Sequence, residues 1–280
     1  MGINLKGDSN MRNGYVRYVE TGNKYGNMNT AKAFYPEDYT AEDRKRAFNE
    51  HRLAAASDYG FKPYMTFMAS QVNKDGSYKV LDEEYVSQYT DGWDADIDED
   101  ILIVTEKTPE IVIGHPVADC PVVMMTDVRN GVSAIGHCSG EMIDKKLPMM
   151  IADALVDYCG SNDDEICTFV SACAGPNWTY DSYPKWATDM KMWEKGIYCG
   201  EDGLFHIDLR KVIASQLMDR KIITNSVFSK IDTISDPRFY SNAAASPNGL
   251  NMPEKAGRNF SGLFYKSKVL EKTKTNGFSK

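Results

Sequence analysis

The sequence lacks long apolar runs, an apolar segment near its start, and cysteines paired at short spacing. No run of 18 apolar residues occurs, so we expect no transmembrane helix and no membrane partner. Residues 1–13 are polar and contain nothing like the apolar core of a secretory signal. The six cysteines form no CxxC pair and no framework typical of a small disulfide-rich domain. We therefore predict reduced thiols and a cytoplasmic protein.

The sequence also lacks an excess of basic residues. Lysine and arginine number 32 against 40 aspartates and glutamates, which gives a net charge of −8. A surface that binds nucleic acid needs clustered Lys and Arg, so we expect no nucleic-acid partner. The hydrophobic content of 42% is ordinary for a globular protein and is enough for a sizeable core.

No linker, internal repeat or low-complexity segment divides the chain. We predict one α/β domain over residues 15–265, preceded by a poorly ordered N-terminus at 1–14 and followed by a polar C-terminal tail at 266–280. Segments typical of strands are interspersed with segments typical of helices. This order predicts a single-domain layered fold with a mixed β-sheet core flanked by helices.

Several elements have clear local signals. Thr40 with Asp43 three residues later is typical of a helix start. The β-branched run at 101–105 predicts a buried strand. Apolar residues at spacings of three and four predict a helix over 147–159, with Gly160 as its C-cap.

A cysteine and a histidine stand at the ends of two apolar runs that we predict to be neighbouring strands. The first run extends over residues 111–120 and continues to 125, and the second extends over 131–137. Asn130-Gly131 between them is a strong hairpin signal. Strand pairing across that turn can bring the Cys120 thiol and the His137 imidazole to the same end of a sheet.

A Cys beside a His is the minimum for a soft metal site or for an activated thiolate. The competing interpretations are a buried, inert Cys120 and a structural His137. His115 lies five residues before Cys120, and an odd offset in an extended strand places two side chains on opposite faces. Unless Pro116 produces a bulge, we expect His115 to stay outside the Cys120 site.

Two segments around these residues resemble paired motifs of the laccase-domain family, also called multicopper polyphenol oxidase-like. Ala118-Asp119-Cys120-Pro121-Val122 resembles its "ADCxPV" motif, and Ala134-Ile135-Gly136-His137 resembles the histidine segment that accompanies it. Further segments follow in the family's order: Ser70-Gln71-Val72-Asn73, Ala174-Gly175-Pro176 with Tyr183, Asp208-Leu209-Arg210, Phe239-Tyr240-Ser241 and Ala256-Gly257-Arg258. The resemblance extends over most of residues 15–265.

The resemblance implies a metal site, usually zinc, built from a His, a Cys and a second His. Here the first His position is Asn73, so Cys120 and His137 are the metal ligands that are left. Zinc is then weakly held or absent, because it prefers three or four N/S ligands. Copper is unlikely despite the family's name, since four histidines cannot supply a multicopper centre.

The family also implies an activity, because some members are purine nucleoside phosphorylases. The resemblance assigns catalysis to Cys120 and His137, and substrate binding to Asn73, Arg258 and Tyr183. Arg258 is suited to bind phosphate, with a structural ion pair as the alternative. The expected partners are a nucleoside and phosphate.

Two other functions stay open. The family's "SyRR" segment reads Ser241-Asn242-Ala243-Ala244 here and has lost its arginines, which favours a homologue that binds a nucleoside-like ligand without turnover. The third is a metal-free hydrolase with Cys120 as nucleophile and His137 as base. That arrangement resembles the deamidating domain of cytotoxic necrotizing factor toxins.

The ligand count leads to a test. We predict that Asn73→His raises zinc affinity by orders of magnitude, because it adds a third good ligand to Cys120 and His137. Zinc titration of both proteins against a chromogenic chelator measures the difference. Equal affinities would mean that Asn73 is not at the site or that another residue, such as His115, already fills the role.

Overall fold

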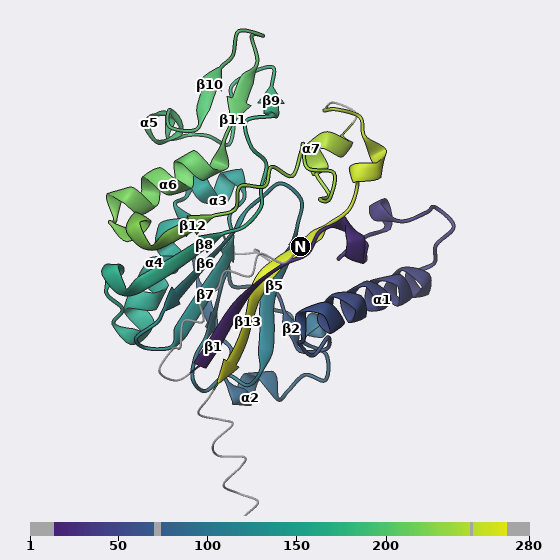
Figure 1. Cartoon of the computed structure of the whole chain (residues 1–280), viewed down its shortest axis with the longest axis vertical. Coiled ribbons are helices and arrows are strands. Elements are labelled where there is room, and N and C mark those ends of the chain that lie inside the picture. The colour runs from purple at the N-terminus through teal and green to yellow at the C-terminus, as the bar shows by residue number, and fades with distance from the viewer. Residues whose placement is uncertain (1–13, 70–73, 247–248, 268–280) are drawn as a thin grey trace, which may run out of the picture.

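The fold was obtained as a computed structural model, which describes residues 14–69, 74–246 and 249–267. Two sheets lie face to face, and helices cover their outer faces (Figure 1). The strands are β1 Gly14–Glu20, β2 Thr66–Phe67, β3 Tyr78–Val80, β4 Ile101–Val104, β5 Ile111–Val117, β6 Val122–Asp127, β7 Val132–His137, β8 Ile166–Val170, β9 Trp178–Tyr180, β10 Ile197–Cys199, β11 Phe205–Ile207, β12 Ser226–Phe228 and β13 Asn259–Ser267. The helices are α1 Ala41–Tyr59, α2 Glu83–Val86, α3 Gly140–Asp144, α4 Leu147–Cys159, α5 Met190–Trp193, α6 Leu209–Asp219 and α7 Asn242–Ala245.

Both large sheets are built from strands that are distant in the sequence. The four-stranded sheet has the order β1-β13-β5-β2, and the six-stranded sheet has the order β12-β8-β6-β7-β4-β3. The six-stranded sheet is mixed, since β3 runs parallel to β4 while β4 and β7 are antiparallel. In Figure 1, α1 lies on one side of the sheets and α4 and α6 lie on the other. The predicted fold class, a layered α/β fold with a mixed sheet core, is confirmed.

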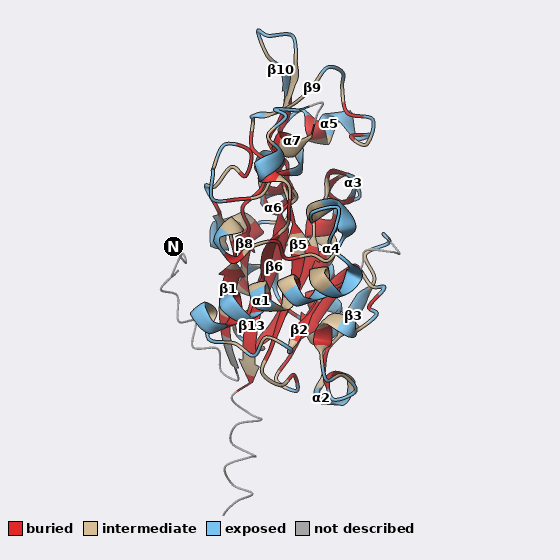
Figure 2. Cartoon of the chain, turned by 90° about the vertical axis from the view of Figure 1, so that its right-hand side faces the viewer, coloured by how far each residue is buried: buried red, intermediate tan, exposed pale blue. Residues whose placement is uncertain are grey.

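Strands of the six-stranded sheet are buried on both faces, which explains their unbroken apolar sequences. In β4, Leu102 and Val104 face the other sheet, while Ile101 and Ile103 face the helices. All four side chains are fully buried. Figure 2 shows the same result for the molecule as a whole, with buried strands in the middle and exposed helix faces outside.

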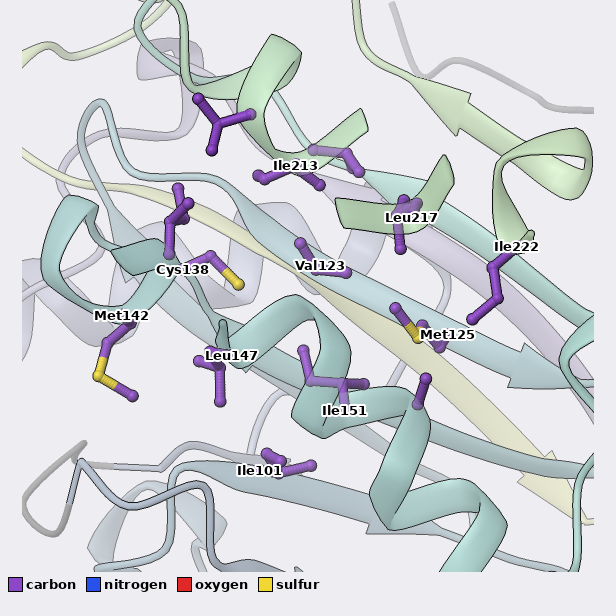
Figure 3. Close-up of a cluster of buried hydrophobic side chains, with 14 of the residues drawn as sticks. Ile101, Val123, Met125, Cys138, Met142, Leu147, Ile151, Ile213, Leu217 and Ile222 are labelled. Atoms are coloured by element: carbon purple, nitrogen blue, oxygen red, sulfur yellow. The ribbon is translucent and has the colours of Figure 1, made fainter. Parts of the chain in front are cut away.

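The helix-side core joins α4 and α6 to this sheet. Val123 and Met125 of β6 pack against Ile151 of α4 and against Ile213 and Leu217 of α6 (Figure 3). Burial of a side chain of this size contributes about 1.5–3 kcal/mol relative to exposure. The predicted bounds of α4 and its C-cap are confirmed, and Gly160 adopts φ 66°, where glycine is favoured.

The outer helix α1 begins at the predicted signal. The Thr40 hydroxyl accepts a hydrogen bond from the Asp43 N–H at 3.1 Å, and the Thr40 N–H donates to the Asp43 carboxylate at 3.0 Å. These reciprocal bonds satisfy donors that the first helical turn leaves open. Ala55 of α1 packs with Val112 and Phe260 on the outer face of the four-stranded sheet.

A third, small sheet with the order β10-β11-β9 stands beyond the end of the two large sheets (Figure 1). Its aromatic side chains join it to the main body. Trp178 stacks on Trp186 with ring centroids 5.9 Å apart, and Trp186 meets Trp193 edge to face at 4.8 Å. Trp193 is fully buried in the helix-side core.

One predicted element is wrong. The apolar run at 111–125 is not a single strand, because β5 belongs to the four-stranded sheet and β6 belongs to the six-stranded sheet. Between them Asp119 has φ 85°, a left-handed conformation that no strand contains. The chain therefore crosses from one layer to the other at residues 118–121.

None of the helices within the described residues is long and apolar enough to span a membrane. The predictions for the two chain ends fall mainly on residues 1–13 and 268–280, which lie outside the described residues. The domain boundaries stay predictions.

Glu20 is an acidic side chain at the end of β1 that lies largely out of water. It points between the two sheets, on the same face as Val16. Its carboxylate accepts a hydrogen bond from the Ala172 N–H. Burial raises the pKa of Glu20 to about 7, although that hydrogen bond acts in the opposite direction.

This raised pKa makes stability depend on pH. Since the folded pKa lies above the unfolded value of 4.5, the contribution of Glu20 is present below pH 4.5 and is lost as pH rises through about 7. A glutamine at position 20 cannot ionise, and its side-chain oxygen can still accept the hydrogen bond from the Ala172 N–H. We predict that Glu20→Gln gains about 2–3 kcal/mol relative to the wild type between pH 4.5 and pH 8.

Urea unfolding at several pH values measures the gain, with the exposed Glu37→Gln as the matched control. A difference between Glu20→Gln and wild type that stays constant over this range would contradict the prediction.

Candidate functional site

The crossing between the two sheets is held by the buried side chain of Asp119. One carboxylate oxygen accepts from the Thr233 hydroxyl at 2.8 Å, and the other accepts from the Ala243 N–H at 2.7 Å. The Asp119 carbonyl also accepts from the Ala174 N–H at 2.8 Å. Three segments distant in sequence thus fix the backbone immediately before Cys120.

Cys120 and His137 come to the same end of the six-stranded sheet. β6 and β7 pair antiparallel with Val122 opposite His137, and the Cys138 N–H donates to the Pro121 carbonyl at 2.8 Å. The predicted hairpin between these strands is confirmed, with Gly131 at φ 69°. Cys120 is partly exposed. The catalytic and metal-binding roles of the pair stay predictions.

His115 belongs to the same cluster. Its ring centroid lies 5.6 Å from that of His137, although the two residues are on different strands, β5 and β7. His115 is only 2% exposed and points between the two sheets, as Ile113 and Val117 do. His115 therefore lies beside His137, while the expectation that it lies apart from the Cys120 thiol stays a prediction. Strand alternation does not relate His115 to Cys120, because at Asp119 the chain leaves the extended conformation and changes sheets.

Arg258 approaches the site from the segment just before β13. Its backbone N–H donates to the Asn27 side-chain oxygen at 2.9 Å, and its guanidinium lies 4.4 Å from the centre of the Phe34 ring. Its charge acts on Cys120, Asp119 and His137. Within the described residues no carboxylate lies within ion-pair distance of Arg258. A structural ion pair, the alternative role for this arginine, is therefore not seen there.

Burial keeps the thiol and the imidazole of the site uncharged at neutral pH. Burial, together with the nearby charge of Arg258, lowers the pKa of His137 to about 4. Burial and, to a smaller extent, the charge of Asp119 raise the pKa of Cys120 to about 12, while the charge of Arg258 opposes the rise. A reactive cysteine needs a lowered pKa, so these shifts oppose an activated thiolate at Cys120.

Of the two predicted substrate-binding residues that the structure describes, Arg258 is near enough for its charge to act on Cys120. Tyr183 lies in the loop after β9, with its ring edge-on to Phe205 at 5.7 Å, and the charges that act on it come from α3 and from the segment around α5. The pKa of Tyr180 is raised mainly by burial, and the charges of Cys120 and Asp119 add to the rise, which indicates that Tyr180 lies near Cys120. Asn73 lies outside the described residues.

The segment that has lost the family's arginines forms the short helix α7. Ser241 caps this helix, and its hydroxyl accepts from the Ala244 N–H at 3.0 Å. Ala244 is fully buried beside Ala174 and Ile234. The side chains of α7 therefore offer no cation for an anionic ligand.

A zinc ion in a protein is bound by three or four nitrogen, sulfur or carboxylate donors around one point. Among the residues that the structure describes, no three His, Cys, Asp or Glu side chains already stand together as a metal-binding group. The neighbouring imidazoles of His115 and His137 are the kind of donor that zinc prefers. The Cys120 thiol is carried by the turn between β5 and β6. As they stand, the side chains of the described residues therefore do not make up a zinc site.

Sequence reasoning missed three members of this cluster. The sequence favours a structural role for His115 and shows Asp119 only as part of a motif. The position of Asp119 between a strand and Cys120 was the available signal, but an aspartate with a left-handed backbone has no sequence signature of its own. For Tyr180, one of 16 tyrosines, nothing in the sequence singled it out.

Comparison with known protein families gives a match over residues 22–261 to the family described as multi-copper polyphenol oxidoreductase laccase. The chain belongs to this family. The resemblance drawn from the Cys120 and His137 segments is thereby confirmed. No curated protein matches the sequence.

Solved structures share the fold at low sequence identity. The hypothetical protein YfiH of Bacillus licheniformis is 16% identical with a TM-score of 0.63, covering 79% of this chain and 81% of its own. YlmD of Geobacillus stearothermophilus is 13% identical with a TM-score of 0.66, covering 90% and 91%. Protein NMB0706 of Neisseria meningitidis is 14% identical with a TM-score of 0.60, covering 91% and 95%. At these identities the likeness establishes the fold alone.

The raised pKa of Cys120 predicts slow alkylation. At pH 8 its thiolate fraction is on the order of 10⁻⁴, because the pKa lies about four units higher. We predict that iodoacetamide at pH 8 modifies the exposed Cys199 more than about 100-fold faster than Cys120. Mass spectrometry of the two peptides over time measures both rates. A Cys120 that reacts as fast as Cys199 would contradict the raised pKa of its thiol.

Proposed function

We propose that the protein is a nucleoside phosphorylase, which transfers the ribosyl group of a purine nucleoside to phosphate. The observation that carries this proposal is the position of Arg258. It is a cation without a carboxylate partner among the described residues, and it lies beside a neutral imidazole and a thiol. Membership of the laccase-domain family supports an enzyme but leaves the substrate open.

The chemistry of Arg258 supports a role in binding phosphate. A guanidinium can donate two parallel N–H bonds to phosphate oxygens. One of its nitrogens already donates to the Gly257 carbonyl at 2.9 Å, and the Phe34 ring supports its face. These contacts hold the group without neutralising its charge, which leaves the remaining donors for an anion.

His137 is suited to move a proton in this reaction. With a pKa of about 4 it is a neutral imidazole at pH 7, so one ring nitrogen can accept a proton. A phosphate oxygen forms a bond to the ribose carbon as the bond from that carbon to the base breaks. The base leaves with the electron pair, and the proton of hydrogen phosphate passes to it through His137.

The test is release of free base. Purified protein is incubated with adenosine or inosine, with and without phosphate and with added zinc, and the base is separated by chromatography. We predict base release that depends on phosphate. Arg258→Ala should lower kcat/KM for phosphate by about 100-fold, because it removes the charge-assisted contacts to the anion.

Arg129→Ala is the matched control, since Arg129 is an exposed arginine at the far end of the β6–β7 hairpin, where it pairs with Glu165. It should retain wild-type kinetics. A wild-type protein that releases no base from either nucleoside, even when loaded with zinc, refutes the proposal.

A second candidate function is binding of a nucleoside-like ligand without turnover. It is favoured by α7, where Ala243 and Ala244 stand at positions that carry arginines in the family. Thermal-shift measurements with nucleosides and nucleotides test it, since a ligand that binds only the folded state raises the Tm. A raised Tm without base release supports this function over the enzyme.

A metal-free hydrolase with Cys120 as nucleophile has less support. The raised pKa of its thiol and the lowered pKa of His137 are opposite to those of a thiolate–imidazolium pair.

A further inference from the structure

Lys255 is a buried lysine at the end of a short 3-10 helix, Pro253–Lys255, and it precedes Arg258 by three residues. The residue is only 5% exposed. Its ammonium group donates two hydrogen bonds of 2.7 Å, to the carbonyl oxygens of Thr233 and Asp236. Among the described residues, no carboxylate lies within ion-pair distance of this group. Packing alone does not explain a lysine here, because an apolar side chain would fill the space without the cost of burying a charge.

Thr233 links the ammonium group of Lys255 to the carboxylate of Asp119. The Thr233 carbonyl accepts from Lys255, while the Thr233 hydroxyl donates to the Asp119 carboxylate at 2.8 Å. In the described part of the chain, the buried side chain of Asp119 bonds only to neutral donors, the Thr233 hydroxyl and the Ala243 N–H. The negative charge of Asp119 also acts on Lys255. A buried cation and a buried anion thus stand on either side of one threonine, where their attraction is only weakly screened.

Lys255 also connects segments that are distant in the sequence. Its carbonyl accepts from the Ser241 N–H at 3.0 Å, just before the helix α7. The Thr233 N–H donates to the Cys173 carbonyl at 3.1 Å, which places the Thr233 loop between Cys173 and Lys255. The side chain of Lys255 therefore joins this loop to the segment that leads to Arg258.

We propose that Lys255 is a positioning residue, which holds the left-handed turn at Asp119 through Thr233 and thereby fixes the place of the Cys120 thiol. The φ of 85° at Asp119 persists only while the surroundings hold it. Loss of the ammonium group leaves two buried carbonyl oxygens without their donor, so the Thr233 loop should separate and release the turn. This role goes beyond the nucleoside phosphorylase proposal, because it holds whatever the substrate is.

The experiment measures how fast iodoacetamide alkylates each cysteine of the purified full-length protein at pH 8, by mass spectrometry of the peptides. Lys255→Met keeps a long unbranched side chain but removes the charge and the donors. We expect the rate at Cys120 to rise by at least about tenfold, because a released turn admits water and reagent to the thiol. The rates at Cys159 and Cys167 should stay within about twofold of wild type. Both lie towards the opposite end of the six-stranded sheet.

Two further variants separate the hydrogen bonds from the packing. Lys255→Arg keeps a cation with N–H donors and should return the Cys120 rate to within about threefold of wild type. Thr233→Val removes the hydroxyl that bonds to Asp119 and should raise the Cys120 rate as Lys255→Met does. Lys230→Met is the matched control, since Lys230 is an exposed lysine three residues before Thr233, and it should react as the wild type does.

The melting temperature of each variant shows whether it folds. A folded Lys255→Met protein whose Cys120 reacts at the wild-type rate overturns the proposal. An equal rise at Cys120, Cys159 and Cys167 also overturns it, because it would indicate a general loosening of the fold. If Lys255→Met does not fold, Thr233→Val decides by the same two outcomes. None of these readouts uses catalysis, so the result is independent of the nucleoside phosphorylase proposal.

Discussion

The crossing of the chain between the two sheets at Asp119 is the constraint on which the site depends. A residue at φ 85° can leave one strand and enter another layer only if its conformation is held from outside. Thr233, Ala243 and Ala174 hold it through hydrogen bonds to its carboxylate and carbonyl oxygens. Without these contacts Cys120 would have no fixed position, and β5 and β6 could continue as one strand.

The same crossing explains the mixture of groups in the site. β5 brings His115 from the four-stranded sheet, while β7 brings His137 from the six-stranded sheet, and the two rings meet where the sheets face each other. Arg258 enters from the start of β13, next to β5. Burial between two sheets then keeps the imidazoles neutral, because a charged ring would lose its hydration there.

Local signals in the sequence were reliable where an element depends mainly on its own residues. The Thr40 cap, the helix α4 and the Asn130-Gly131 hairpin were all predictable, because each rests on contacts over a few residues. Parity along a strand cannot place His115 relative to Cys120, since it assumes an unbroken extended chain and the chain turns at Asp119. Local sequence patterns could not predict that Arg258 lies near Cys120 and His137, because these residues are more than a hundred positions away in the sequence.

The sequence by itself determined the fold class, the family and the presence of a Cys120–His137 pair, since apolar patterning and motif order are local properties. Only the tertiary structure decided that His115 lies beside His137, that Tyr180 and not Tyr183 is near Cys120, and that the thiol and imidazole are uncharged. The physical reason is that burial and proximity arise from the packing of two sheets whose strands come from distant parts of the chain. Such contacts leave no periodic trace in the order of the residues.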